Sequence, residues 1–112
     1  MKLINYKKVK AEKNDNPQAK DVRIRWAISK EDGAPNFALR VFELKPGGHS
    51  PYHSHKWEHE VFIKSGKGKL VCEDKNFPLK EGDVIFIPGR EKHQFLNSSR
   101  GILEFICIVP IR

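Results

Sequence analysis

The chain has 112 residues, a length that suits one domain with a single hydrophobic core. Its 21 lysines and arginines outnumber 14 aspartates and glutamates, which gives a net charge of +7. The basic residues are dispersed and match no nucleic-acid-binding motif, so we predict a solvated basic surface and no nucleic-acid partner. No apolar run approaches the roughly 20 residues that cross a bilayer, so no membrane partner is expected.

The N-terminal third predicts one clear strand between polar segments. Residues 3–6 are expected to form a short edge strand, and the polar residues 11–20 a loop. Apolar side chains then alternate over residues 22–28, which is typical of a half-buried strand. The alternation places four side chains on one face: Val22, Ile24, Trp26 and Ile28.

The middle of the chain predicts a strand, a break and a histidine-rich strand. Residues 37–44 are too apolar on both faces for periodicity to orient them, and the residues 45–48 are expected to end that strand. The histidine-rich segment follows, and the glycines in residues 64–68 predict a hairpin turn.

The last third predicts four or five short strands separated by glycine and proline. Pro78 favours an edge or irregular position for its segment. The predicted strands are residues 69–73, 77–79, 84–87, 93–97 and 102–109. Many short strands without a convincing helix indicate an all-β fold, an antiparallel sandwich or barrel.

The last strand can be oriented from its own residues. Glu104 is its only charged residue, so its parity should face outward. The inward side chains are then Leu103, Phe105, Cys107 and Val109. Cys107 either shares a functional cavity or is a small core residue.

The two cysteines favour a reducing compartment. Cys72 and Cys107 lie in separate apolar runs and form no C-x-x-C pair. Two such thiols suit a cytoplasmic protein better than a disulfide framework. Residues 1–8 lack the apolar core of a signal peptide, which gives the same expectation.

Four of the five histidines lie in residues 47–66. On an extended strand His53, His55 and His59 share a parity and point to one face, which Val61 and Ile63 continue with apolar groups. This pattern predicts part of a metal site inside a β-barrel. A carboxylate ligand from Glu58 or Glu60 is the alternative, if a bulge at Trp57 turns one of them inward.

Two spaced motifs resemble those of the cupin superfamily. The first cupin motif is a glycine, His-x-His, a glutamate and a glycine, and here it reads Gly47, His53, His55 and Gly66 with His59 at the glutamate position. The second motif reads Gly82, Pro88, His93 and Asn97. Arg90 stands where cupins have a glycine, with Gly89 one residue earlier.

The resemblance implies a single cupin domain over residues 1–112, a double-stranded β-helix or jelly-roll barrel, with residues 1–20 as an N-terminal edge strand and loop. The histidine segment looks most like small cupins with four histidine ligands, some of which bind manganese. The implied ligands are His53, His55, His59 and His93. A vestigial, metal-free cluster is the alternative. His49, before the predicted strand, is expected to be a solvated loop residue.

The resemblance also implies one divalent transition-metal ion. Manganese or iron is preferred, while imidazole also suits nickel, copper and zinc. Four neutral imidazoles leave the full +2 charge of such an ion to act on a small-molecule substrate. The residues expected in the substrate pocket are Trp57, Phe95, Phe105 and Cys107.

The function expected by this resemblance is a dioxygenase-type oxidoreductase that acts on an enolisable, diol or phenolic substrate. The alternatives are a cupin that binds or senses a small molecule without turnover, and a metal-dependent isomerase, lyase or cyclase. A cavity without a carboxylate would favour dioxygen chemistry or binding over proton transfer. The residues 3–6 are a candidate to pair with a second subunit, so a homodimer is expected.

Overall fold

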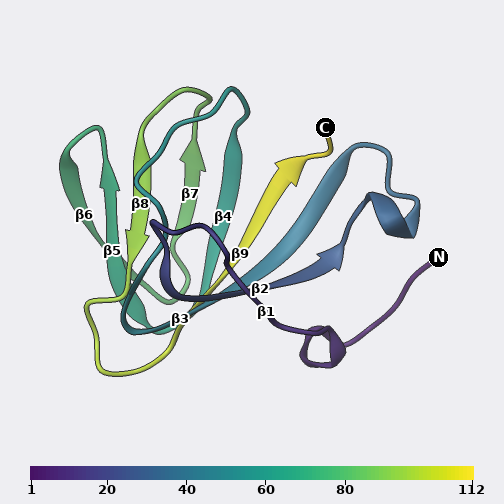
Figure 1. Ribbon diagram of the computed structural model, residues 1–112, viewed down its shortest axis with the longest axis horizontal. Helices are drawn as coiled ribbons and strands as arrows, with labels where there is room; N and C mark the ends of the chain where they lie inside the picture. Colours follow the sequence, from purple (N-terminus) through teal and green to yellow (C-terminus); the bar gives the residue numbers. More distant parts are fainter.

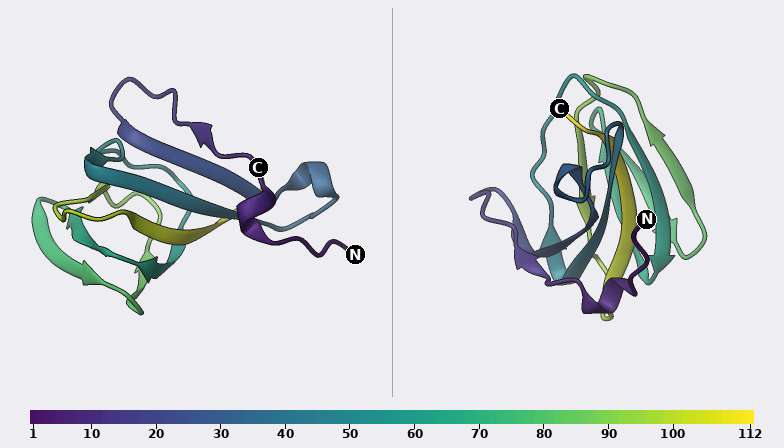
Figure 2. Two further views of the ribbon diagram at one scale, coloured as in Figure 1. Left: turned by 90° about the horizontal axis from the view of Figure 1, so that it is seen from below. Right: turned by 90° about the vertical axis from the view of Figure 1, so that its right-hand side faces the viewer.

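The computed structural model describes residues 1–112 and shows nine antiparallel strands in one curled sheet (Figures 1 and 2). The strands are β1 (Glu12–Lys13), β2 (Lys20–Ile28), β3 (Phe37–His49), β4 (His59–Ser65), β5 (Lys67–Cys72), β6 (Lys75–Lys80), β7 (Val84–Ile87), β8 (His93–Leu96) and β9 (Leu103–Pro110). Two 3-10 turns, η1 (Tyr6–Lys8) and η2 (Lys30–Asp32), complete the regular structure. Neither turn has the length or apolarity that a membrane-crossing helix needs. The all-β antiparallel prediction is confirmed.

The sheet runs in the order β6-β5-β8-β3-β9-β4-β7, and β2 pairs with β3 and carries β1 on its other edge. β3 holds the two halves of the curl together, because it pairs with β9 over most of its length and with β8 at His49. The prediction that residues 45–48 end this strand is wrong. The chain bends at Gly47, whose φ is +79°, and continues as strand.

The inner face of the curl holds the hydrophobic core. All four predicted inward residues of β9 are buried, with exposed fractions of 3% or less, which confirms the orientation deduced from Glu104. The Phe105 ring stacks on Phe42 at a centroid distance of 4.9 Å and on Phe95 at 4.5 Å. These three rings separate the tightly packed core from an open cavity at the other end of the curl.

Asn97, the last residue of the second motif, has a structural role. Its buried side-chain amide donates to the carbonyl oxygens of Leu44 and Gly101, both at 2.8 Å. Asn97 thus joins the end of β8 to β3 and to the turn before β9. It has no part in the histidine cluster.

We expect Asn97→Ala to lower the free energy of unfolding by roughly 2–4 kcal/mol, because two carbonyl oxygens lose their donor and one of them is deeply buried. Urea unfolding of the variant measures this loss. Ser98→Ala, at an exposed neighbouring position, is the control and should change stability by less than about 0.5 kcal/mol. Equal stability of the two variants would contradict this role for Asn97.

Two other local predictions fail for identifiable reasons. The alternation in β2 ends at a register shift between Trp26 and Ile28, so Ala27 is buried while Trp26 is 44% exposed. The residues 64–68 form no hairpin, because β5 pairs with β6 and β8 and not with β4. Gly66, at φ +90°, turns the chain between the halves and packs so closely on the Ile102 carbonyl that a Cβ would overlap it.

The N-terminal segment also differs from the prediction. The residues 3–6 form no strand, and Leu3 is 87% exposed, since a single turn of 3-10 helix begins at Tyr6. The predicted loop over residues 11–20 contains the two-residue strand β1. The expected strand over residues 3–6 is therefore absent from the single chain, and its pairing with a second subunit and the homodimer itself stay predictions. Pro78 lies on the edge strand β6, as predicted.

Candidate metal centre

His53 and His93 face each other across a backbone bridge. The His93 N–H donates to the His53 carbonyl at 2.9 Å, and the His53 N–H donates to the His93 carbonyl at 3.1 Å. His93 is the first residue of β8 and is buried, whereas His53 is the more exposed of the two. Two ligand candidates far apart in sequence are thereby held side by side.

His55 lies in the segment between β3 and β4, which is not a strand. The chain bends at Lys56 and Trp57, so the continuous extended strand predicted through the three histidines does not exist. The turn after β7 supports the bend. The Arg90 N–H donates to the His55 carbonyl at 2.6 Å, and a side chain at Gly89 would overlap the Lys56 carbonyl.

Arg90 occupies the motif position where cupins have glycine, and its φ is +74°. The left-handed conformation implied by that glycine is therefore present, at a strain that a non-glycine residue has to bear. The departure from the motif leaves the turn intact.

His59 begins β4, and from there the predicted parity holds. His59, Val61 and Ile63 are buried, while Glu58 and Glu60 are exposed and do not line the cavity. The bend at Trp57 thus brings neither glutamate inward.

The four histidine rings form one cluster. Ring centroids lie 5.1 Å apart for His53 and His55, 5.2 Å for His53 and His93, and 5.1 Å for His55 and His93. These three residues bring ligand nitrogens within 4.8 Å of one another. His59 adjoins them, with its ring 4.5 Å from His55 and 5.0 Å from His93. A three-histidine group able to hold a metal is therefore present, with a fourth imidazole beside it.

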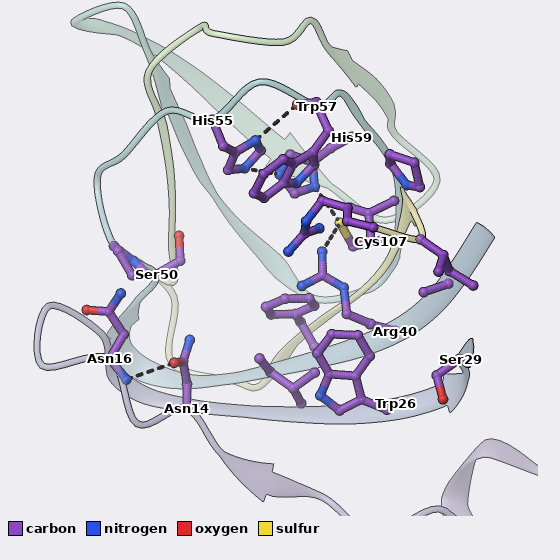
Figure 3. A pocket seen from close by; sticks show the side chains of 18 of the residues that line it. Asn14, Asn16, Trp26, Ser29, Arg40, Ser50, His55, Trp57, His59 and Cys107 are labelled. Carbon is purple, nitrogen blue, oxygen red and sulfur yellow. Dashed lines mark hydrogen bonds between the residues drawn. The ribbon is translucent and has the colours of Figure 1, made fainter. Parts of the chain in front are cut away.

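Backbone acceptors fix the orientation of two rings. His93 Nδ1 lies 2.8 Å from the Glu91 carbonyl oxygen. His55 Nδ1 lies 3.0 Å from the Trp57 carbonyl oxygen (Figure 3). A carbonyl only accepts, so each Nδ1 carries the proton and each Nε2 keeps a free lone pair. Histidines that bind a metal through one ring nitrogen usually donate the N–H of the other ring nitrogen to an acceptor in this way.

His59 is connected to the cluster and to a thiol. Its Nε2 lies 2.6 Å from His55 Nε2, and its Nδ1 lies 3.0 Å from Cys107 Sγ. Without an ion, Nε2–H donates to His55 Nε2 and Nδ1 accepts a hydrogen bond from the Cys107 S–H. In the other tautomer Nδ1–H donates to sulfur and Nε2 is free as a ligand. The donor set therefore fits a divalent transition-metal ion.

Burial keeps these imidazoles neutral. It lowers the pKa of His55 to about 4 and that of His59 to about 2, and it lowers the pKa of His53 and His93 as well. Electrostatic repulsion by the neighbouring His55 and His93 imidazoles, and then by the Arg40 guanidinium, lowers the pKa of His59 further. Neutral imidazole is the form that binds metal, so the cluster is ready to do so at pH 7.

A cavity of about 700 Å³ opens onto the cluster. All four histidines line it, and so do the predicted pocket residues Trp57, Phe95, Phe105 and Cys107. Trp57 stacks on His55 with a centroid distance of 4.2 Å and nearly parallel planes. His49 does not line the cavity, and its half-buried ring contacts the Ser50 carbonyl and Gln94 instead. It is less solvated than expected.

Arg40 is the cavity residue that sequence reasoning missed. It lies on β3, and its Nη2 donates to Cys107 Sγ at 3.1 Å (Figure 3). A charge in the apolar run 37–44, with the parity of Phe42 and Leu44, was the available signal. Only the register with β9, where Arg40 pairs with Cys107, shows that this parity faces inward.

Comparison with known proteins now identifies the fold. Residues 40–109, more than half of the chain, match the cupin domain family. The chain belongs to this family. The match contains all four cluster histidines, and metal binding is common among cupins.

Cupins of several activities are similar to this chain. The polyketide cyclase RemF from Streptomyces resistomycificus shares 36% identity with a TM-score of 0.95, over 100% of this chain and 80% of that one. The oxalate-binding protein of Thermotoga maritima is 32% identical over 93 residues, which are 80% of this chain and 75% of the relative. The Rhodospirillum rubrum 1-methylthio-D-xylulose 5-phosphate methylsulfurylase is 37% identical over 71 residues, 63% of this chain. The match covers 46% of that enzyme, so the chain spans only part of its length.

Proposed function

We propose that this cupin binds one divalent transition-metal ion through His53, His55, His59 and His93 and acts on a small organic molecule in the adjoining cavity. The observation that carries the proposal is the convergence of four neutral imidazole rings at the wall of that cavity. Manganese or iron is the preferred ion. Four uncharged ligands leave its charge undiminished, which favours an oxygen-rich, anionic substrate.

The reaction we propose is dioxygenation of an enolisable, diol or phenolic substrate. The support is that none of the carboxylates beside the histidines lines the cavity, so none is placed to serve as a general base. The acidic residues that line the cavity, Glu12 and Glu31, are exposed and lie on β1 and η2, away from the histidine segment. A bound iron or manganese ion would supply Lewis acidity and redox capacity, and the chain would hold and orient the substrate.

A metal-dependent cyclisation is the second candidate. It is favoured by the similarity to the polyketide cyclase RemF over the whole chain. The similarity to an oxalate-binding protein favours binding without turnover. All three functions use the same metal and cavity, and they differ in whether dioxygen is consumed and whether a product forms.

Elemental analysis of protein purified without added metal should find close to one manganese or iron ion per chain. With candidate diols, phenols and β-dicarbonyl compounds, we expect oxygen uptake that a chelator abolishes and the same metal restores. Product formation under anaerobic conditions would instead indicate cyclisation or isomerisation. Saturable binding without product would indicate a binding protein, and absence of metal would contradict the metal site itself.

Two further properties belong to this proposal. Cys72 and Cys107 are free thiols on β5 and β9, which fits a cytoplasmic location. A homodimer remains our expectation, and light scattering that finds only monomer at high concentration would contradict it.

A further inference from the structure

Arg40 carries a positive charge that nothing in the chain neutralises. The three ion pairs of the protein join Lys2 to Asp32, Arg25 to Glu43 and Lys64 to Glu104. Arg40 belongs to none of them. Its one hydrogen bond runs from Nη2 to Cys107 Sγ, and its Nε is buried without any partner. A guanidinium has five N–H donors, so most of this group's capacity is unused.

Aromatic contacts hold the guanidinium in place. Its central carbon lies 4.8 Å from the Phe42 ring centroid and 5.3 Å from that of Trp26. Stacking of this kind fixes a guanidinium plane without consuming its N–H groups. The geometry presents a positioned cationic fork, which matches a carboxylate in two parallel hydrogen bonds.

The cavity around Arg40 combines cationic and aromatic groups with two exposed glutamates, Glu12 and Glu31, that form no ion pair with Arg40. A second arginine, Arg112, lines it with its guanidinium 3.5 Å from the Trp57 ring centroid and likewise forms no ion pair. Phe95 and Phe105 add aromatic walls. An oxyanion would be attracted into such a site, and a flat conjugated body would pack against its rings.

Arg40 also lies close to the histidine cluster. Cys107 Sγ joins them, at 3.1 Å from Arg40 Nη2 and 3.0 Å from His59 Nδ1. One small molecule can therefore contact the guanidinium and reach the histidines at once. If Arg40 binds the anionic end of a small molecule, the other end of that molecule would point toward the proposed metal ion.

We propose that Arg40 is the substrate's anion receptor, and that the cavity takes a planar aromatic or conjugated molecule whose carboxylate binds the unpaired guanidinium. The inference rests on the proposed function for the role of the ion, but the Arg40 contact itself does not require metal. It assigns the substrate class as an organic oxyanion with an apolar, conjugated body.

The test is binding of salicylate, with salicylamide as its uncharged match, to the metal-loaded protein. Trp26 and Trp57 line the cavity, so quenching of tryptophan fluorescence reports binding, and calorimetry confirms the affinity. We expect salicylate to bind at least about tenfold more tightly than salicylamide. Arg40→Gln should remove most of that preference and leave the metal content and salicylamide binding unchanged. Arg40→Lys, which keeps the charge without the fork, should be intermediate.

Arg23→Gln is the matched control, because Arg23 is exposed on β2 and does not line the cavity. It should bind salicylate as the unmodified protein does. Inorganic phosphate as a competitor distinguishes a general oxyanion site from a carboxylate site, and stronger binding of phosphate would overturn the carboxylate assignment. Unchanged salicylate binding by both Arg40 variants, or no binding of salicylate to the unmodified protein, would overturn the proposal. Arg40-dependent binding in a protein that holds no metal would support it while the metal proposal fails.

Discussion

Alanine at His93 is expected to lower metal affinity by more than about a hundredfold. The loss of an outer hydrogen-bond partner already costs 10- to 100-fold in metal sites, and removal of a ligand should exceed that. His93 is the candidate ligand whose removal we expect to cost the most affinity, because its ring is buried at the start of β8 and oriented by the Glu91 carbonyl. Dialysis against a competing chelator, followed by elemental analysis, measures the retained ion.

His59→Ala decides between three and four ligands. His53, His55 and His93 alone bring nitrogens within 4.8 Å of one another, so a three-ligand site would survive this change. We expect His59→Ala to lose much of the metal, because His59 Nε2 lies against His55 Nε2 on the inner side of the cluster. Glu60→Gln should retain the ion, since Glu60 is exposed on the other face of β4.

His49→Ala supplies the histidine control, because His49 lies outside the cavity. Its metal content should equal that of the unmodified protein. If Glu60→Gln emptied the site while His59→Ala kept the ion, the assignment of ligands on β4 would be wrong.

The sequence predicted which histidines make up the candidate site, but it predicted their arrangement only in part. Spacing grouped His53, His55 and His59, the resemblance to cupins added His93, and the structure brings all four rings together. The stated reason, one face of a continuous strand, applies only from His59 onward. His55 is placed by the bend at Trp57 and by the turn that contains Gly89 and Arg90, and such tertiary contacts leave no periodic signal in a sequence.

The orientation of a strand could be predicted where a single charged side chain distinguished its two faces. Glu104 oriented β9 correctly, because a single charge distinguishes the two faces of an otherwise apolar strand. β3 carries two charges of opposite parity within residues 37–44, Arg40 and Glu43, so the same rule gives no orientation there, and the charge that lines the cavity is Arg40. Turn residues were misleading in a different way. Gly47 bends β3 without ending it, and Gly66 connects two halves of the curl where a hairpin was expected.

Removal of the metal is expected to lower the thermal midpoint at pH 7 by several degrees, and this difference should vanish in acid. An ion that binds only the folded chain stabilises it by about 2.7 kcal/mol when its free concentration is a hundred times its Kd. For a domain of this size that corresponds to roughly 10 °C. As the pH falls below about 6.5 toward the lowered pKa values of the folded imidazoles, about 4 for His55, protons compete with the ion, so it dissociates in a steep step and the two midpoints converge.

The metal-free protein should itself lose stability over the same range. Free histidine in the unfolded chain has a pKa of about 6.5, whereas burial lowers the folded pKa of His55 to about 4 and of His59 to about 2. The unfolded state therefore binds more protons as the pH falls below about 6.5, and unfolding becomes more favourable down to the folded pKa values. For buried His59 alone the slope is at most about 1.4 kcal/mol per pH unit.

Thermal midpoints measured from pH 8 to about pH 3.5, with and without chelator, test both parts of this prediction, because the range passes the lowered pKa of His55. His59→Leu removes one buried titrating group, so the chelated variant should show a shallower acid slope than the chelated unmodified protein. His49→Ala should leave the slope unchanged, because His49 lies outside the cavity and its ring is not part of the histidine cluster. Identical midpoints with and without metal at pH 7, in samples whose metal content is verified, would mean that the sheet is stabilised by its apolar faces and Asn97 alone and that the ion serves the chemistry of the cavity.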